Sequence, residues 1–124
     1  MVTKNPAPDV LSARCPTRTV LDLIADKWTV LVIHVLAAGT HRFGELQRAI
    51  DGISQKMLTQ TLRRLEQDGL LARTVFPEVP PRTEYALTPL GKTLRTPLQS
   101  LCAWAEQHMP EVAKARSRAA SARR

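Results

Sequence analysis

The sequence has few aromatic residues, only two cysteines and no long hydrophobic run. Phe, Trp and Tyr make up 4% of its 124 residues, so Leu, Val, Ile and Ala must fill the core of the one domain that this length suits. The longest apolar run, residues 28–38, is too short to span a bilayer, and no apolar stretch near the N-terminus indicates a signal peptide. We therefore expect a cytoplasmic protein.

Motifs for catalysis and for metal binding are also missing from the sequence. It contains no glycine-rich phosphate loop, no paired carboxylate motif and no pattern of nucleophile and base. His34, His41 and His108 lie far apart and lack metal-ligand spacing with the two cysteines. The sequence therefore predicts a protein that is not an enzyme and that uses no metal or cofactor.

The net charge of +7 is unevenly distributed along the chain. Residues 114–124 carry five of the eighteen Lys and Arg residues and none of the eleven Asp and Glu residues. Global charge is therefore weak support for a nucleic-acid partner, and the local distribution matters more. We expect a flexible arm at 1–13, a folded domain at 14–112, and a basic tail at 113–124 that is disordered or a fraying helix end.

Residues 42–71 form the most informative segment and are typical of two short helices joined by a tight turn. Gly52 supplies backbone freedom in the turn, and the side chain of Ser54 can accept a hydrogen bond from an amide of the second helix. Ile53 before this cap and Leu58 after it suit a hydrophobic staple.

At about 100° per residue, the second helix separates into an apolar face and a polar face. The apolar face contains Met57, Leu58, Thr61, Leu62 and Leu65. The polar face contains Gln55, Lys56, Thr59, Gln60, Arg63 and Arg64. Such side chains provide donors for base edges in the major groove of DNA and cations for phosphates. An ordinary amphipathic helix with a solvated face has the same pattern, so the wheel alone leaves both interpretations open.

Two candidate strands follow the second helix, which Gly69 can end in the left-handed cap position. They span residues 71–76 and 82–87, and the loop between them contains three prolines, which cannot donate ladder hydrogen bonds. A two-helix unit followed by a hairpin is typical of a winged helix. In that arrangement Arg82 and Arg73 lie beside the duplex backbone or the minor groove.

Two more helices are expected outside this unit. Residues 28–38 suit a helix that Asp26 caps and that is buried on more than one side. The last helix starts at Thr88 as cap, and Pro97 should bend or interrupt it. Its apolar stripe contains Leu90, Leu94, Leu98, Leu101 and Ala105, with Trp104 close by. This stripe packs either against a second chain or back on its own domain.

Many short motifs occur in a fixed order between Cys15 and about Pro110. They are Cys15-Pro16, Asp26-Lys27-Trp28, Gly39, Arg42-Phe43, Glu45-Leu46, Gly52-Ile53-Ser54, Lys56, Leu58-Thr59, Leu62, Leu65-Glu66, Asp68-Gly69-Leu70, Pro80-Pro81-Arg82, Glu84-Tyr85, Leu87-Thr88, Gly91 and Trp104. This ordered set resembles the HxlR family of bacterial winged helix-turn-helix regulators, although Thr83 stands where that family more often has Val. The resemblance implies a mainly α fold with a small β-hairpin, and a winged helix-turn-helix with extra N- and C-terminal dimerisation helices.

The helix pattern and the resemblance together predict a homodimeric transcriptional regulator that binds double-stranded DNA sequence-specifically. The expected base-reading residues are Gln55, Lys56, Thr59, Gln60 and Arg63. The expected phosphate and wing contacts are Arg42, Ser54, Arg64, Arg73 and Arg82. The expected dimer interface contains Leu21, Ile24, Leu94, Leu98, Leu101 and Trp104. The alternative is a winged helix used only for protein contacts, although the cations retained on the polar face argue against it.

Cys15 precedes Pro16, which suits the first position of a helix, so its sulfur is expected at a positive helix end near Arg14 and Arg18. These conditions favour a reactive thiolate. In several regulators of the resembled family the cysteine at this position senses oxidants or electrophiles, which makes Cys15 a candidate redox sensor. The alternatives are a structural Cys15 in a regulator controlled by a small molecule, or a regulator with no effector. Cys102 lies among apolar residues of the last helix, and burial is its expected role.

Overall fold

The computed structural model describes residues 11–123 as a chain of helices with one small sheet. Its elements are α1 (Pro16–Ala25), α2 (Lys27–Leu36), β1 (His41–Arg42), α3 (Phe43–Ala49), α4 (Gln55–Gln67), β2 (Leu71–Phe76), β3 (Arg82–Leu87), α5 (Pro89–Lys92) and α6 (Arg95–Ala122). The protein is mainly helical, at 63%, with a three-stranded antiparallel sheet. The expected winged helix-turn-helix with additional N- and C-terminal helices is therefore confirmed.

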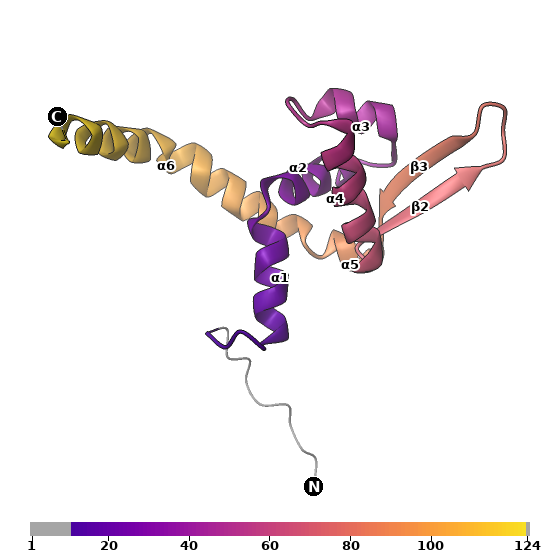
Figure 1. Ribbon diagram of the computed structural model, residues 1–124, viewed down its shortest axis with the longest axis horizontal. Coiled ribbons are helices and arrows are strands. Elements are labelled where there is room, and N and C mark those ends of the chain that lie inside the picture. The colour runs from indigo at the N-terminus through magenta and orange to yellow at the C-terminus, as the bar shows by residue number, and fades with distance from the viewer. Residues whose placement is uncertain (1–10, 124) are drawn as a thin grey trace, which may run out of the picture.

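Three arms project from a helical body (Figure 1). The body contains α2, α3 and α4, which lie together in the view. The β2–β3 hairpin extends from it to the right, α1 extends downward and α6 extends to the left. The expected recognition helix α4 thus belongs to the body, whereas the helices α1 and α6 project from it.

The sheet is antiparallel and has the strand order β1-β3-β2. The strands expected at 71–76 and 82–87 are confirmed as β2 and β3, with Leu71 opposite Leu87. The sequence did not predict β1, in which His41 pairs with Tyr85 of β3. This short strand directly precedes α3, so it joins the helix-turn-helix to the hairpin.

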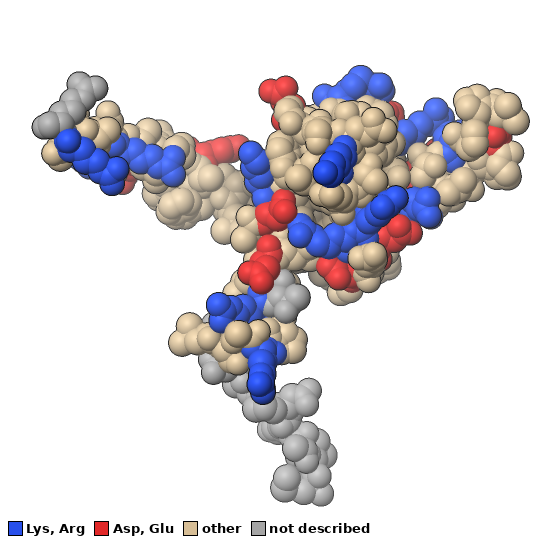
Figure 2. Space-filling view, in the orientation of Figure 1, with Lys and Arg blue, Asp and Glu red and all other residues tan. Residues whose placement is uncertain are grey.

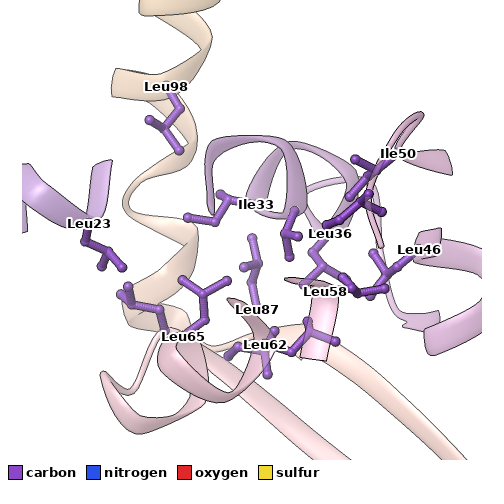
Figure 3. Close-up of a cluster of buried hydrophobic side chains, with 14 residues drawn as sticks. Leu23, Ile33, Leu36, Leu46, Ile50, Leu58, Leu62, Leu65, Leu87 and Leu98 are labelled. Atoms are coloured by element: carbon purple, nitrogen blue, oxygen red, sulfur yellow. The ribbon is translucent and has the colours of Figure 1, made fainter. Parts of the chain in front are cut away.

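Aliphatic side chains from each part of the body form one core (Figure 3). Val32 of α2, Leu46 of α3, and Leu58 and Leu65 of α4 are each 0% exposed. The aromatic side chains that contact this core are only partly buried, at its edge. The core is thus filled as the low aromatic content of the sequence predicts, and it fixes the position of α4.

Both ends of α4 are held by the residues that the sequence singled out. The Ser54 hydroxyl accepts the N–H of Met57 at 3.0 Å, which confirms its capping role. At the other end Gly69 has φ of 74°, and the N–H of Leu70 donates to the carbonyl of Leu65 at 3.0 Å. This is the Schellman arrangement, which pairs a carbonyl that a helix end would otherwise leave without a partner.

The C-terminal region is divided into two helices. Thr88 caps α5, as expected, because its hydroxyl accepts the N–H of Gly91 at 3.1 Å. A separate helix, α6, begins at Arg95, two residues before Pro97. The interruption expected near Pro97 is therefore present, just ahead of the proline.

The basic tail, for which disorder or a fraying helix end was expected, is helical as far as Ala122, because α6 continues through Pro110. Alanine and arginine are favourable helix residues, and a helix that already exists extends without a new nucleation step. Residues 1–10 of the expected N-terminal arm lie outside the described residues. No helix within 11–123 has the length and apolar character needed to cross a membrane.

Candidate nucleic-acid interface

The core leaves one long face of α4 uncovered. Leu58, Thr61, Leu62 and Leu65 of the expected apolar face are buried on the inner side of α4, and Met57 is partly buried at its edge. The outer face presents side chains that are exposed: Gln55, Lys56, Gln60 and Arg63. These groups provide amide donors and acceptors together with two positive charges. The structure therefore places four of the five expected base-reading residues on one accessible surface.

Thr59 is the exception among the five expected base-reading residues, because it is only partly exposed. Its hydroxyl donates to the carbonyl of Gln55, one turn earlier in α4, at 2.8 Å. With the hydroxyl proton used inside the helix, Thr59 can offer DNA its methyl group and an acceptor lone pair. The expected role of Thr59 therefore changes from a hydrogen-bond donor to an apolar or hydrogen-bond-accepting contact.

Arg64 points to α2 instead of joining the outer face of α4. Its Nη2 donates to Oδ2 of Asp26 at 2.9 Å and to the hydroxyl of Thr29 at 3.1 Å. Partial burial acts to raise the pKa of Asp26, but hydrogen bonds from Arg64, Thr29 and Trp28 outweigh it and lower the pKa below its ordinary value. The sequence had predicted Asp26 as a helix cap and Arg64 as a phosphate contact, and it did not show that the two side chains meet.

The arginines of the hairpin also have carboxylate partners. Arg82 lies 3.2 Å from Glu78 and 3.4 Å from Glu84, and its guanidinium lies over the ring of Phe76 at 4.1 Å. Ion pairs of this half-exposed kind contribute at most about 1 kcal/mol, so they can be exchanged for phosphate contacts at little cost. Arg82 is thus oriented by its neighbours, and its side chain remains 28% exposed.

A second hairpin ion pair joins the wing to the recognition helix. Arg73 of β2 lies 3.6 Å from Glu66 of α4. Both residues line a hollow of about 260 Å³ between α4 and the sheet, together with Arg63 and Tyr85. Burial raises the pKa of Tyr85 above its ordinary value, although the nearby Arg73 acts in the opposite direction. Tyr85 therefore keeps its hydroxyl proton at neutral pH.

Arg42 is exposed and lies at the other end of the helix-turn-helix, directly before α3. Its N–H donates to the Glu45 carboxylate at 2.7 Å, which caps α3. A hollow of about 420 Å³ separates Arg42 from the hairpin tip, which includes Val79. Figure 2 shows Lys and Arg side chains over the body and the hairpin, interspersed with Asp and Glu. The positive charge on this face is therefore local and does not form one uniform basic patch.

Comparison with known proteins identifies the family. The HxlR-like helix-turn-helix family matches residues 23–113. The chain belongs to the HxlR family. It is 44% identical over 113 residues to the HTH-type transcriptional regulator YtfH of Escherichia coli (strain K12), with 91% of this chain and 90% of the relative covered. Its relatives are transcriptional regulators, and the chain is a regulator of the winged-helix type.

Solved structures of other transcriptional regulators have the same fold. The transcriptional regulator ytfH from Salmonella typhimurium superposes with a TM-score of 0.82 at 42% identity, covering 90% of this chain and 99% of that one. The redox regulator HypR in its oxidised form superposes with a TM-score of 0.70 at 40% identity, covering 75% of this chain and 96% of that one. The fold is therefore shared with a regulator that responds to redox state.

The residues expected at an HxlR dimer interface fall into two groups. Leu98 is buried, and Ile24 and Leu94 pack partly buried against the core of the protomer. Leu21, Leu101 and Trp104 are 49%, 55% and 55% exposed. The stripe on α6 thus folds back on its own domain as far as Leu98 and is uncovered beyond that residue.

Cys15 lies at the N-cap of α1, directly before Pro16, as the sequence predicts. The residue is only 7% exposed, so its thiol is largely shielded from an oxidant in this conformation. Cys102 is partly buried on α6, and Cys15 and Cys102 are not joined by a disulfide. No group of three or more His, Cys, Asp and Glu side chains that could hold a metal ion occurs within the described residues 11–123.

Proposed function

We propose that this HxlR-family regulator acts as a homodimer that binds a two-fold symmetric operator, with α4 of each chain in a major groove. The observation that carries the proposal is the outer face of α4. Its inner face is buried in the core, while Gln55, Lys56, Gln60 and Arg63 stand free of the body. Direct readout of bases requires a rigid helix that fits the major groove and presents amide and cationic groups to the base edges.

The other contacts position the helix. Arg42 and the first turn of α4 at Ser54 supply phosphate contacts, because helix N-termini and exposed cations attract anions. Arg82 and Arg73 contact the flanking backbone from the hairpin, after exchanging Glu78, Glu84 and Glu66 for phosphate oxygens. Lys56 and Arg63 are cations on the exposed face of α4, so each can contact a base edge or a phosphate.

The homodimer is supported by the apolar side chains that the protomer leaves exposed. Val20 and Leu21 of α1 are exposed, as are Leu101 and Trp104 of α6. Two helices with uncovered apolar faces are stabilised when a second copy covers them. A two-fold dimer then places two copies of α4 on one side of a duplex, separated by about one or two helical turns.

A base-preference measurement tests the proposal. Operator sequences are selected from random duplex DNA with the wild-type protein, and the preference is then measured again for Gln60→Ala. We expect a loss of about 1–3 kcal/mol of discrimination at the contacted base pair. Gln67→Ala removes the same side chain from the C-terminal end of α4, and it should leave the preference unchanged. A wild-type protein with no duplex affinity at low salt would favour the alternative of a winged helix used only for protein contacts.

A second proposal concerns the signal, which is sensed by Cys15. It is supported by the position of the thiol at the N-cap of α1 and by the similarity to the redox regulator HypR. Oxidation of a thiol that is 7% exposed requires α1 to move or the preceding segment to open. Such movement would displace α1, which carries the exposed Val20 and Leu21 of the proposed dimer interface. A regulator controlled by a small molecule instead would show no dependence of DNA binding on Cys15.

A further inference from the structure

One carboxylate connects three helices of the HxlR fold. Asp26 is the single residue between α1 and α2, and its N–H donates to the carbonyl of Leu23 at 3.3 Å, which closes α1. Its Oδ1 accepts the N–H of Trp28 at 2.8 Å and that of Thr29 at 3.3 Å, which caps α2. The corner between the projecting helix α1 and the body is therefore held by this one residue.

The third helix is the recognition helix. The remaining oxygen of Asp26, Oδ2, accepts from Nη2 of Arg64 at 2.9 Å, and the same nitrogen donates to Thr29 Oγ1 at 3.1 Å. Thr29 is 1% exposed, so its hydroxyl is a fixed partner. Arg64 lies 38 residues after Asp26 in the chain and comes from α4. The side chain thus bridges α4 to the α1–α2 corner by two hydrogen bonds.

Arg64 occupies the flank of α4, beside the partly buried Met57, and not the centre of its outer face. Arg63 is rotated away by about 100° and belongs to the outer face. The two neighbouring arginines therefore have different surroundings: Arg63 faces solvent with the base-reading groups, and Arg64 is engaged by Asp26 and Thr29. The partners of Arg64 lie at the α1–α2 corner, so its move to a phosphate would break a contact between helices, whereas the ion pairs of Arg82 lie within its own hairpin.

We propose that Arg64 is a positioning residue, which fixes the angle between α4 and the α1–α2 corner and thereby the distance between the two recognition helices of the dimer. The inference rests on the proposed function, because it concerns how the dimer fits its operator. Helix α1 carries the exposed Val20 and Leu21, so a rotation between α1 and α4 in each protomer changes the separation of the two α4 helices. The Asp26–Arg64 bridge restrains this rotation.

Asp26→Asn distinguishes a positioning role from a phosphate contact by the sign of its effect. Asparagine caps helices as well as aspartate does, so α2 keeps its cap while the charge that holds Arg64 is lost. A released positioning residue weakens operator binding. If Arg64 were instead a phosphate contact in competition with Asp26, the substitution would free it and strengthen binding.

The first experiment measures affinity by fluorescence anisotropy for an operator selected with the wild-type protein and for a random duplex, across 50–200 mM salt. We expect Arg64→Gln and Asp26→Asn each to weaken operator binding about tenfold. For Arg64→Gln, the affinity for the random duplex and the salt slope should stay nearly unchanged. A phosphate contact would behave differently, since its loss weakens all duplexes alike and reduces the slope by about 0.9 for each contact, or about 1.8 for the two copies in a dimer. Arg42→Gln, at an expected phosphate contact, serves as the matched control.

The second experiment varies the separation of the operator half-sites by one base pair at a time. The wild-type protein should prefer one spacing, and Arg64→Gln and Asp26→Asn should flatten that preference, because their recognition helices are less restrained. The double variant should show no further loss, since both single changes break the same bridge. A role in stability alone would lower the midpoint of thermal unfolding and leave the spacing preference as in the wild type.

The outcomes separate the two proposals. A wild-type protein that binds no duplex at low salt overturns DNA binding and the positioning role together. A wild-type protein that binds, with an Arg64→Gln variant that loses salt slope or keeps the wild-type spacing preference, overturns the positioning role and leaves DNA binding intact. Arg64→Lys provides a further check, because it keeps the charge and should restore part of the spacing preference if the bridge to Asp26 re-forms.

Discussion

Helices α4 and α6 are both amphipathic, but the protomer covers only one of them. Helix α4 has 13 residues, a side-chain cap at Ser54 and four buried residues on its inner face. Helix α6 has 28 residues, no side-chain cap at Leu94 and one buried residue, Leu98. In Figure 1 α4 lies in the body, whereas α6 extends well beyond it.

The difference shows which parts of the fold one chain can stabilise. An isolated helix gains little stability from propensity alone, and most of it comes from packing of the apolar face. The protomer provides that packing for α4 but leaves Leu101, Trp104 and Met109 of α6 at 55%, 55% and 44% exposure. Burying a fully exposed large apolar side chain contributes about 1.5–3 kcal/mol, and roughly half of that remains available at each of these three positions, so a second chain can still gain on α6.

The largest expected effect tests whether α4 belongs to the protomer core and α6 does not. Leu58→Ala removes a side chain that is 0% exposed, and we expect a loss of about 2–5 kcal/mol in the free energy of unfolding. Leu101→Ala is the matched truncation on α6, where the side chain is 55% exposed, and it should cost less than about 1 kcal/mol in dilute protein. Urea unfolding followed by circular dichroism measures both values.

Protein concentration sharpens this comparison. If α6 is covered by a second chain, the cost of Leu101→Ala should rise as the concentration increases into the range of the dimer, whereas the intrinsic cost of Leu58→Ala to the protomer should persist at every concentration. Equal costs for the two variants in dilute protein would show that α6 is part of the same core as α4, and the contrast between the helices would fail.

The second largest effect tests whether a second chain covers the exposed apolar stripe of α6. Trp104→Glu places a charge on the exposed apolar stripe, and we expect it to weaken dimerisation about a hundredfold, because a buried unpaired charge is strongly unfavourable. Gln99→Glu introduces the same group at an exposed position about 140° around the helix from Trp104 and should leave the dimer intact. Sedimentation velocity at micromolar concentration measures both. A monomeric wild-type protein would remove the dimer from the proposed function.

The sequence predicted α4 and the hairpin closely because their signals are local. Ser54 caps the helix, Gly69 takes the positive φ at its end, and the prolines between residues 76 and 82 separate the two strands. Each of these features depends on residues a few positions apart. The outer face of α4 could be read from the helical period for the same reason.

The features that the sequence did not predict depend on distant partners or on packing. Strand β1 has two residues and exists because His41 and Arg42 pair with β3 more than forty residues later. The contact between Arg64 and Asp26 likewise spans 38 residues. On a helical wheel Arg63 and Arg64 are both polar, and only the position of α2 shows that one faces solvent and the other bridges two helices.

A smaller effect is expected from Cys15, which lies on α1 and thus on the projecting side of the molecule. Diamide is reduced as it joins two thiols, here Cys15 of one chain and Cys15 of a second chain, in a disulfide. This oxidation should weaken operator binding about tenfold, be reversed by added thiol, and be absent in Cys15→Ser. Cys102→Ser, at the half-buried cysteine of α6, is the matched control and should keep the response. A gel shift with reduced and oxidised protein measures it. An unchanged response in Cys15→Ser would assign the thiol a structural role.

The smallest expected effect concerns acid and tests how firmly α4 is tied to the α1–α2 corner. Because the pKa of Asp26 is lowered in the folded protein, its interactions add stability above the ordinary value of 3.8, and this contribution is lost as the pH falls through the lowered pKa. The side chains of Arg64 and Asp26 are 46% and 30% exposed, so the contribution of their ion pair to stability should not exceed about 1 kcal/mol. Asp26→Asn should therefore be less stable than the wild type at pH 7, and the difference should shrink as the pH is lowered below 3.8. Urea unfolding of dilute protein between neutral and acidic pH measures this. A difference that stayed constant with pH would show that the ionised bridge between Asp26 and Arg64 adds no stability.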